Sequence, residues 1–139
     1  MSQENVEIVR RVFEELDAGL ERGNVSGAFD AGLIAPDYEW IIPPGTPLSG
    51  TYQGREGWEA FMRVWTENFE DWSARVDRFI DAGDDRVLVI VRQTAVGRGS
   101  GAPVEWSQGQ IYELEGGRVI RVRNYLDPAQ AFEAAGLSK

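Results

Sequence analysis

The stretch WSQGQIYEL, at positions 106–114, alternates amides with aromatic residues in a way that could form a binding site. Successive side chains of a β-strand point to opposite faces, so one face would carry Trp106, Gln108, Gln110, Tyr112 and Leu114. That face is either a wet surface or the lining of a pocket. Because amides do not exchange protons near neutral pH, their chemistry would be ligand orientation or oxyanion stabilisation.

Several kinds of catalysis are excluded by residue types that the chain lacks. It contains no cysteine and no histidine, and its single lysine is the last residue, Lys139. Disulfides, thiolate nucleophiles, serine–histidine triads and histidine metal sites are therefore excluded. We expect no Schiff base on Lys139, no metal and no cofactor, so any proton transfer would fall to Asp, Glu or Tyr.

The charge and hydropathy of the chain limit its partners. The net charge is −9, from 14 basic and 23 acidic residues, so the average field repels nucleic acids and anionic membranes. We interpret the one basic cluster, RVIRVRNY at 118–125, as the solvated face of a strand. No apolar run approaches the roughly 20 residues that cross a bilayer, and the start of the sequence has no signal-peptide core. We expect a cytoplasmic protein.

The elements that would position these residues begin with helices. Apolar residues at helical spacing predict an amphipathic helix over 2–23. A weaker helix, interrupted by two glycines, is predicted near 25–35 and would end at Pro36. Aromatic residues spaced by three and four predict a third helix over 55–72.

The remaining pattern is typical of strands. Alternation predicts a short strand at 37–42, followed by a proline- and glycine-rich loop. Four further strands would form an antiparallel meander, at 73–82, 85–97, 102–114 and 117–126. A closing helix follows, with Asp127 as its N-cap. This order predicts one α+β domain over 1–139, in which a curved antiparallel sheet wraps around the first and third helices.

The order of several motifs supports a resemblance to a known family. After the opening helix come PDYEW, GTYQGREGWEAF, DAGDDRVLVIV, GQIYELEGGRVIRV and YLDPAQAFEAAG. Together they resemble SnoaL-like proteins of the nuclear transport factor 2-like superfamily, over essentially the whole chain. The resemblance implies a cone-shaped α+β barrel with a pocket at its open end, frequently a homodimer packed through the outer sheet faces. It implies no single reaction, because the superfamily includes polyketide cyclases, isomerases and non-catalytic binders.

The resemblance also shows which proton-transfer residues this chain lacks. The general base of the ketosteroid isomerases falls on Ile42, their oxyanion tyrosine on Val12, and their neutral aspartic acid on Gln110. The acid–base aspartate of the SnoaL cyclases falls on Asn124. Dehydratases of this fold rely on histidine, which is absent here. Each proton-transfer residue that the resemblance carries over to this chain is therefore replaced by an apolar or amide group.

Strand register decides which way the amides face. The apolar parity of the last strand, with Ile120, Val122, Asn124 and Leu126, predicts that Asn124 faces the core. The family register turns the amide face of 106–114 to the same side. An inward amide without a partner costs about 1 to 3 kcal/mol, so these amides need one another, water or a ligand. We predict a pocket lined by Tyr38, Trp40, Trp106, Gln108, Gln110, Tyr112 and Asn124; the alternative is a closed core with a satisfied amide network.

Three functions are compatible with this pattern. The leading hypothesis is a pocket protein that buries a small, largely apolar ligand and orients its carbonyl or hydroxyl groups through the amides. The alternative is a cyclase, isomerase or lyase that acts on a polyketide-like or carbonyl substrate. In that enzyme Tyr38 or Tyr112 would be the acid, and Gln110 and Asn124 the oxyanion donors.

The third hypothesis is a homodimeric interaction protein, which would use the outward residues Arg121, Arg123 and Tyr125 of the last strand. A carboxylate inside the cavity would favour the enzyme. The sequence predicts none there, because Glu39 lies on the outward parity and Asp127 is a helix cap.

Overall fold

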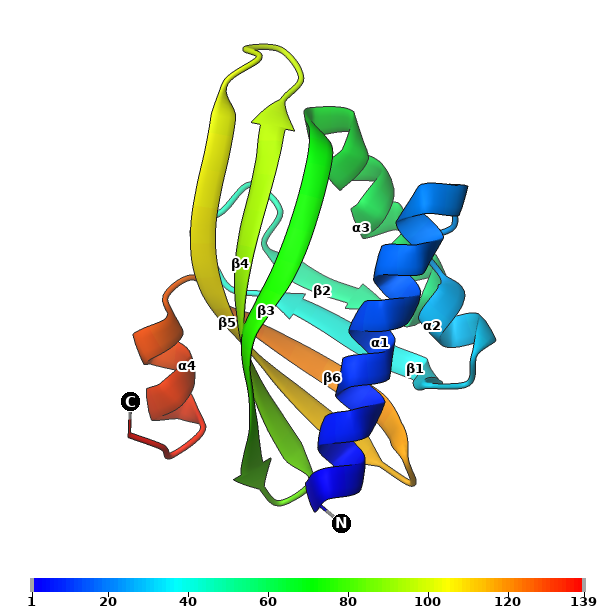
Figure 1. The fold of residues 1–139 in the computed structure, drawn as a ribbon, viewed down its shortest axis with the longest axis vertical. Coiled ribbons are helices and arrows are strands. Elements are labelled where there is room, and N and C mark those ends of the chain that lie inside the picture. The colour runs from blue at the N-terminus through cyan, green and yellow to red at the C-terminus, as the bar shows by residue number, and fades with distance from the viewer. Residues whose placement is uncertain (1, 139) are drawn as a thin grey trace.

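The computed structural model describes residues 2–138, so Lys139 lies outside the described residues. The elements, labelled in Figure 1, are α1 (Ser2–Arg22), α2 (Gly27–Asp30), β1 (Ile34–Ile42), β2 (Gly50–Gln53), α3 (Gly54–Asn68), β3 (Phe69–Gly83), β4 (Arg86–Gly97), β5 (Pro103–Glu115), β6 (Arg118–Tyr125) and α4 (Pro128–Ala134). Among these residues no helix is long and apolar enough to cross a membrane.

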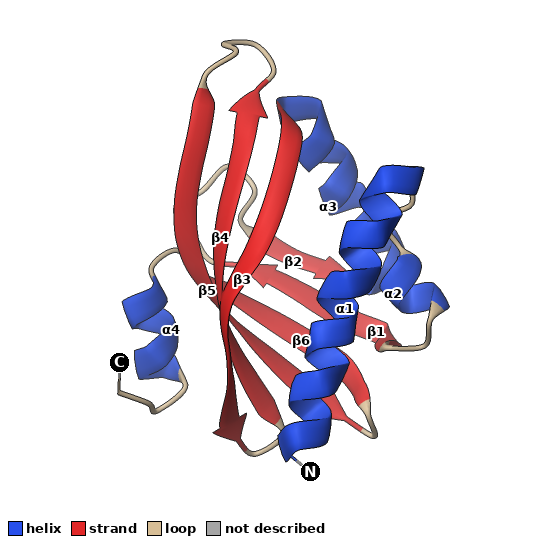
Figure 2. Cartoon of the chain, viewed as in Figure 1, coloured by secondary structure: helices blue, strands red, loops and turns tan. Residues whose placement is uncertain are grey.

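The strands form one curved sheet that does not close on itself. Their order is β2-β1-β6-β5-β4-β3, and β3 to β6 form an antiparallel meander, which confirms the predicted α+β fold. The first strand, β1, joins the meander by pairing in parallel with β6, whereas β2 pairs antiparallel with β1. Helices α1, α2 and α3 lie on one side of the sheet, and α4 lies apart from them against the other side (Figure 2).

Amphipathic helices cover the concave side because their apolar residues recur every three or four positions. The inner face of α1 buries Val9 and Val12, and α3 buries Trp58, Phe61 and Met62. These side chains form one apolar cluster with the inward residues of β1, β4, β5 and β6. The concave side of the sheet and the helices therefore share the main core.

On the outer side, α4 packs against β5. Its N-cap is Asp127, as predicted, and the Asp127 side chain accepts a hydrogen bond from the backbone of Ala129 at 2.9 Å. Gly109 of β5 permits this docking, because a Cβ at that position would collide with Ala131. Part of the outer face is thus already covered within the chain.

The predicted second helix is wrong over most of its length. Only α2 forms there, and Ile34 already begins β1. Gly32 adopts a positive φ of 75°, which ends the helix, and the Leu33 amide closes the turn on the carbonyl of Ala28. Pro36 does not end a helix. It lies in β1 where the pairing with β6 is interrupted between Ile34 and Glu39, so its missing N–H costs no ladder bond.

The predicted third helix is too long at its C-terminal end. The helix α3 ends at Asn68 and Phe69 begins β3. Asp71 has a positive φ of 51°, and the pairing of β3 with β4 shifts between Glu70 and Ser73, which marks a bulge. The bulge leaves Phe69 and Trp72 on the same side although they are three residues apart. The three-residue spacing of Phe69 and Trp72, which predicted a helix, is therefore the spacing of a bulged strand.

The predicted register is wrong for one residue of the last strand. Consecutive residues of β5, Glu113 and Leu114, pair with Arg121 and Val119, so Ile120 is an extra residue on β6. Val119 is fully buried in its place. Ile120 instead lines a polar groove beside Arg121 on the outer face. Beyond the bulge the predicted parity holds, because Val122 and Asn124 are buried.

Candidate functional site

A cavity of about 610 Å³ lies between the concave side of the sheet and helices α1 to α3. Its wall is largely aromatic and aliphatic, and it includes Thr46, Pro47 and Leu48 from the loop between β1 and β2. Two of its lining residues, Val104 and Leu126, are 37% and 53% exposed, so they mark where the cavity opens to solvent. This volume is in the range of protein sites for drug-sized molecules.

The structure places every residue of the predicted pocket in this wall. They are Tyr38, Trp40, Trp106, Gln108, Gln110, Tyr112 and Asn124. β1 supplies the first two, β5 the next four and β6 the last. All five tryptophans of the chain line the same cavity, which adds Trp58, Trp65 and Trp72.

The amides form a hydrogen-bonded chain whose direction is fixed at its ends. Trp106 Nε1 donates to Gln108 Oε1 at 2.9 Å, and Gln108 Nε2 donates to Asn124 Oδ1 at 3.0 Å. Asn124 Nδ2 donates to the backbone carbonyl of Ile41 at 2.9 Å. An indole N–H can only donate and a carbonyl can only accept, so the orientation of both amides between them is forced.

A second branch of the chain reaches Tyr112. Gln110 Nε2 donates to Asn124 Oδ1 at 2.9 Å, and the Tyr112 hydroxyl donates to Gln110 Oε1 at 3.0 Å. Asn124 therefore accepts two hydrogen bonds and donates one. The amides satisfy one another and still line the cavity, so the satisfied network and the lined cavity, which the sequence left as alternatives, occur together.

A fourth amide of the wall was missed from the sequence. Gln93 of β4 is 6% exposed, and its Oε1 accepts a hydrogen bond from Trp72 Nε1 at 2.7 Å. The residues two positions away on the same face, Val91 and Ala95, are apolar, so its segment predicts a core strand with no site. The pairing of the two strands would have identified it, because Gln93 lies opposite Trp106 and therefore shares its face of the sheet.

The two tyrosines of the wall are held in their neutral form. Burial raises the pKa of Tyr38 well above its usual value, and the neighbouring Tyr112 adds to the effect. Burial likewise raises the pKa of Tyr112. Neither phenol can act as a base near neutral pH, and both are weaker acids than free tyrosine. They can serve as hydrogen-bond donors.

No Asp, Glu, Lys or Arg side chain lines the cavity among residues 2–138. Glu39 lies on the outer face, where it pairs with Arg121 at 2.8 Å, and Arg121 also pairs with Glu113 at 2.8 Å. Asp127 caps α4. Within the same residues no group of three potential metal ligands comes together. The wall can bind through shape, apolar contact and neutral hydrogen bonds.

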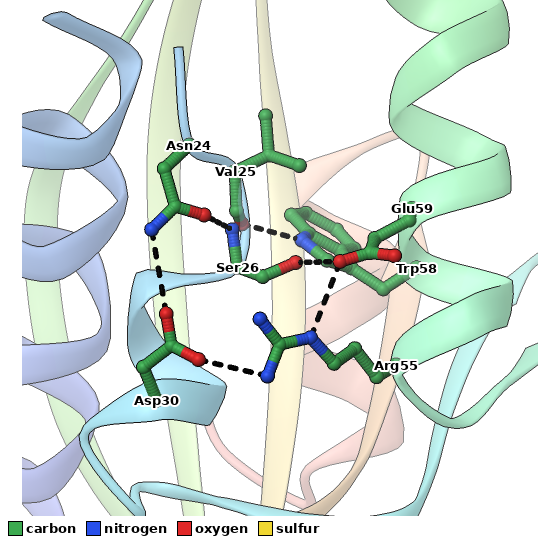
Figure 3. A network of polar contacts seen from close by, with 7 residues as sticks. All are labelled: Asn24, Val25, Ser26, Asp30, Arg55, Trp58 and Glu59. Carbon is green, nitrogen blue, oxygen red and sulfur yellow. Dashed lines mark hydrogen bonds and ion pairs between the residues drawn. The ribbon is translucent and has the colours of Figure 1, made fainter. Parts of the chain in front are cut away.

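A cluster of polar side chains connects α2 and the preceding turn to α3 (Figure 3). The buried Ser26 hydroxyl donates to Glu59 at 2.6 Å, and Arg55 bridges Glu59 at 3.2 Å and Asp30 at 2.8 Å. Trp58 Nε1 donates to the carbonyl of Val25 at 2.7 Å. Trp58 and Val25 themselves line the cavity, so the cluster holds one side of the wall in place.

This cluster predicts a dependence of stability on pH. Hydrogen bonds, from Arg55 and Asn24 to Asp30 and from Ser26 and Arg55 to Glu59, lower the pKa of both carboxyls. Because the folded-state pKa is lowered, the stabilisation is present above the ordinary values of 3.8 and 4.5 and is lost as pH falls through the lower folded-state values. We expect Arg55→Gln to lower the melting temperature at pH 7, and the gap from the wild type to narrow toward pH 3.

The control for this measurement is Arg92→Gln. Arg92 and Asp77 are about as exposed as Arg55 and Asp30, but they lie 3.7 Å apart rather than 2.8 Å, and Arg92 has no second carboxylate partner among the described residues, so their pair should stabilise less. The melting temperature of this variant should stay close to that of the wild type at both pH values. A gap for Arg55→Gln that stays constant from pH 7 to pH 3 would contradict the assignment of the lowered pKa values to this cluster.

Comparisons with known proteins identify the family. The model of the SnoaL-like domain matches residues 9–122, which is most of the chain. The protein therefore belongs to the SnoaL-like domain family. No match was found among curated proteins.

Solved structures with the same fold include proteins of different description. A nuclear transport factor 2-like protein of unknown function from Burkholderia pseudomallei is 24% identical, with a TM-score of 0.74, over 96% of this chain and 97% of that one. TerC, co-crystallised with polyporic acid, is 20% identical, with a TM-score of 0.74, over 96% and 98%. A putative SnoaL-like polyketide cyclase from Jannaschia sp. is 24% identical, with a TM-score of 0.72, over 100% and 96%. At these identities the likeness is one of fold.

Proposed function

We propose that this protein binds one small, uncharged and largely apolar molecule in the cavity between the sheet and α1 to α3. The observation that carries the proposal is the composition of the wall. It joins five tryptophans and several other apolar side chains to a few neutral polar groups, with no charged side chain among the described residues. Ligand sites are typically apolar with a few polar groups that fix orientation.

The same wall disfavours a charged ligand. An ion that leaves water without a partner of opposite charge pays a large desolvation cost, and nothing in the wall offers such a partner. The net charge of −9 further repels anions at long range.

Two proteins of the same fold support an organic ligand, since one was co-crystallised with polyporic acid and another is described as a putative polyketide cyclase.

The wall gives less support to an enzyme. Its only ionisable groups among the described residues are Tyr38 and Tyr112, whose raised pKa values disfavour proton transfer. Gln110 and Asn124 could stabilise an oxyanion, but each already uses its side chain in the amide chain. A homodimer that packs through the outer sheet face is a separate prediction. Part of that face is already covered by α4, and another part carries the ion pairs of Arg121. Sedimentation can test whether the protein is a dimer.

The proposal can be tested with pyrene and pyrenetetrasulfonate. Both have the same flat ring system, but the second carries charged groups around its edge. Energy transfer from the five tryptophans to the pyrene ring reports binding, and the cavity-filling variant described in the Discussion reports whether the bound ring lies in the cavity. At high salt, which screens the net charge, we expect saturable binding of pyrene and at least about tenfold weaker binding of the sulfonate, equivalent to about 1.4 kcal/mol. Equal binding of the two, or none, would refute the proposal.

A further inference from the structure

Four polar groups of the cavity wall lack a hydrogen-bond partner among residues 2–138. Nε1 of Trp40, Nε1 of Trp65 and Oγ1 of Thr46 are buried without one. The fourth is the hydroxyl of Tyr38, which lines the cavity and makes no hydrogen bond to the described residues, although it is not fully enclosed like the other three. Buried polar groups without partners are uncommon in native proteins, so three enclosed ones in one wall require an explanation.

The four groups share one property, which is that all of them can donate. The two indole N–H groups can do nothing else, whereas the two hydroxyls can also accept. The amide oxygens beside them on β4, β5 and β6 are differently placed, because each already accepts a hydrogen bond from the protein. The accepting atoms are Gln93 Oε1, Gln108 Oε1, Gln110 Oε1 and Asn124 Oδ1. What the two indole N–H groups lack is an acceptor.

We propose that Tyr38 and Trp40 form a subsite that recognises a hydrogen-bond acceptor, so the ligand carries a carbonyl-type oxygen on its apolar frame. Both residues belong to β1 and, two positions apart, face the same side. The Tyr38 hydroxyl donates to the ligand oxygen directly. This inference rests on the proposed function, because it names the chemistry of the ligand that the cavity binds.

Trp40 requires a small movement to take part. Its Nε1 is covered by protein, and its ring lies 5.0 Å from Trp58 and 5.5 Å from Phe61, measured between ring centroids. To donate to a ligand oxygen, the indole must therefore rotate within this aromatic cluster when the ligand binds. The penalty of a buried donor without a partner is then relieved only when an acceptor is bound, which favours carbonyl compounds over compounds that offer an N–H.

Three compounds of nearly equal shape test the subsite. At the position where they differ, 9-fluorenone has a carbonyl acceptor, carbazole an N–H donor, and fluorene a methylene group with neither. Dissociation constants from equilibrium dialysis should show that fluorenone binds about tenfold more tightly than fluorene and also more tightly than carbazole, because only the carbonyl can accept from both Tyr38 and Trp40. Tyr38→Phe should reduce the preference for fluorenone to about twofold or less, while leaving the affinity for fluorene unchanged.

A matched control and a second variant complete the test. Tyr125→Phe removes a hydroxyl from the outer side, where Tyr125 packs beside α4, and should keep the full preference. If Tyr38→Phe does not fold, Trp40→Phe carries the test, because it removes the indole N–H and keeps an aromatic ring; it too should lower the preference.

The outcomes separate this inference from the proposed function. Binding of fluorene with no preference for fluorenone would overturn the subsite alone. A preference that survives Tyr38→Phe and Trp40→Phe would overturn its assignment to β1. Failure of all three compounds to bind the wild-type protein would overturn the proposed function and the subsite with it.

Discussion

Replacing Asn124 with leucine is expected to lower the free energy of unfolding by about 2 to 4 kcal/mol, because the change leaves several hydrogen-bonding groups without a partner at once. Asn124 accepts hydrogen bonds from Gln108 and Gln110 and donates to the carbonyl of Ile41. Leucine has a similar size but can make none of these bonds. Urea denaturation gives the measurement. Asn68→Leu is the control, since the exposed Asn68 amide bonds only to the carbonyl of Val64, and it should cost less than about 1 kcal/mol.

The double variant with Gln110→Leu tests whether these residues act as one network. Gln110→Leu alone removes the acceptor of Tyr112 and one donor to Asn124. The two substitutions should therefore couple by about 1 kcal/mol or more in a double-mutant cycle. Near-neutral and additive effects would show that the amide chain does not hold the wall together, and that solvent satisfies these groups instead.

Filling the cavity is expected to remove ligand binding while the fold is kept. Ala74 of β3 lines the cavity and pairs across the sheet with Gln93, so Ala74→Trp places a large ring in the space that a ligand would take. The affinity for pyrene should fall at least about tenfold. Since the cavity has room for the new ring, stability should change by less than the 1 to 3 kcal/mol that overpacking typically costs.

The neighbouring residue provides the control for this experiment. Ser73 is exposed on the opposite face of β3, so Ser73→Trp adds the same ring outside the cavity. Its affinity for pyrene should match that of the wild type. Equal affinity of wild type, Ala74→Trp and Ser73→Trp would mean that pyrene binds elsewhere on the surface.

The fold could be predicted from the sequence wherever local pattern and tertiary pairing agree. The four long strands are rich in β-branched and aromatic residues and are separated by turns that contain glycine, so their order and the meander were predictable. One error is the second helix, which ends early at Gly32. The other two lie where a bulge breaks the period of a strand. Asp71 in β3 and Ile120 in β6 each add a residue to one strand, and no property of these side chains announces it.

The residues of the cavity wall could be predicted only in part, because strand parity shows which way a side chain faces but not which residues it contacts. Parity places Gln108, Gln110 and Asn124 on one inward face, and the structure keeps all three in the wall. The partners of each amide depend on neighbours from other strands, such as the carbonyl of Ile41, which only the assembled sheet defines. Gln93 was missed because the residues on the same face of its own strand, Val91 and Ala95, are apolar, although its partner on the neighbouring strand is Trp106.

The most direct test of the central claim is a crystal of the protein soaked with bromonaphthalene, located by the anomalous scattering of bromine. Bromonaphthalene is uncharged and small enough for a cavity of about 610 Å³. The account predicts a bromine peak inside the wall, in van der Waals contact with aromatic side chains such as Trp58 and Trp106. Bromine only on the outer surface, or a crystal structure in which the protein's own side chains fill this space, would contradict it.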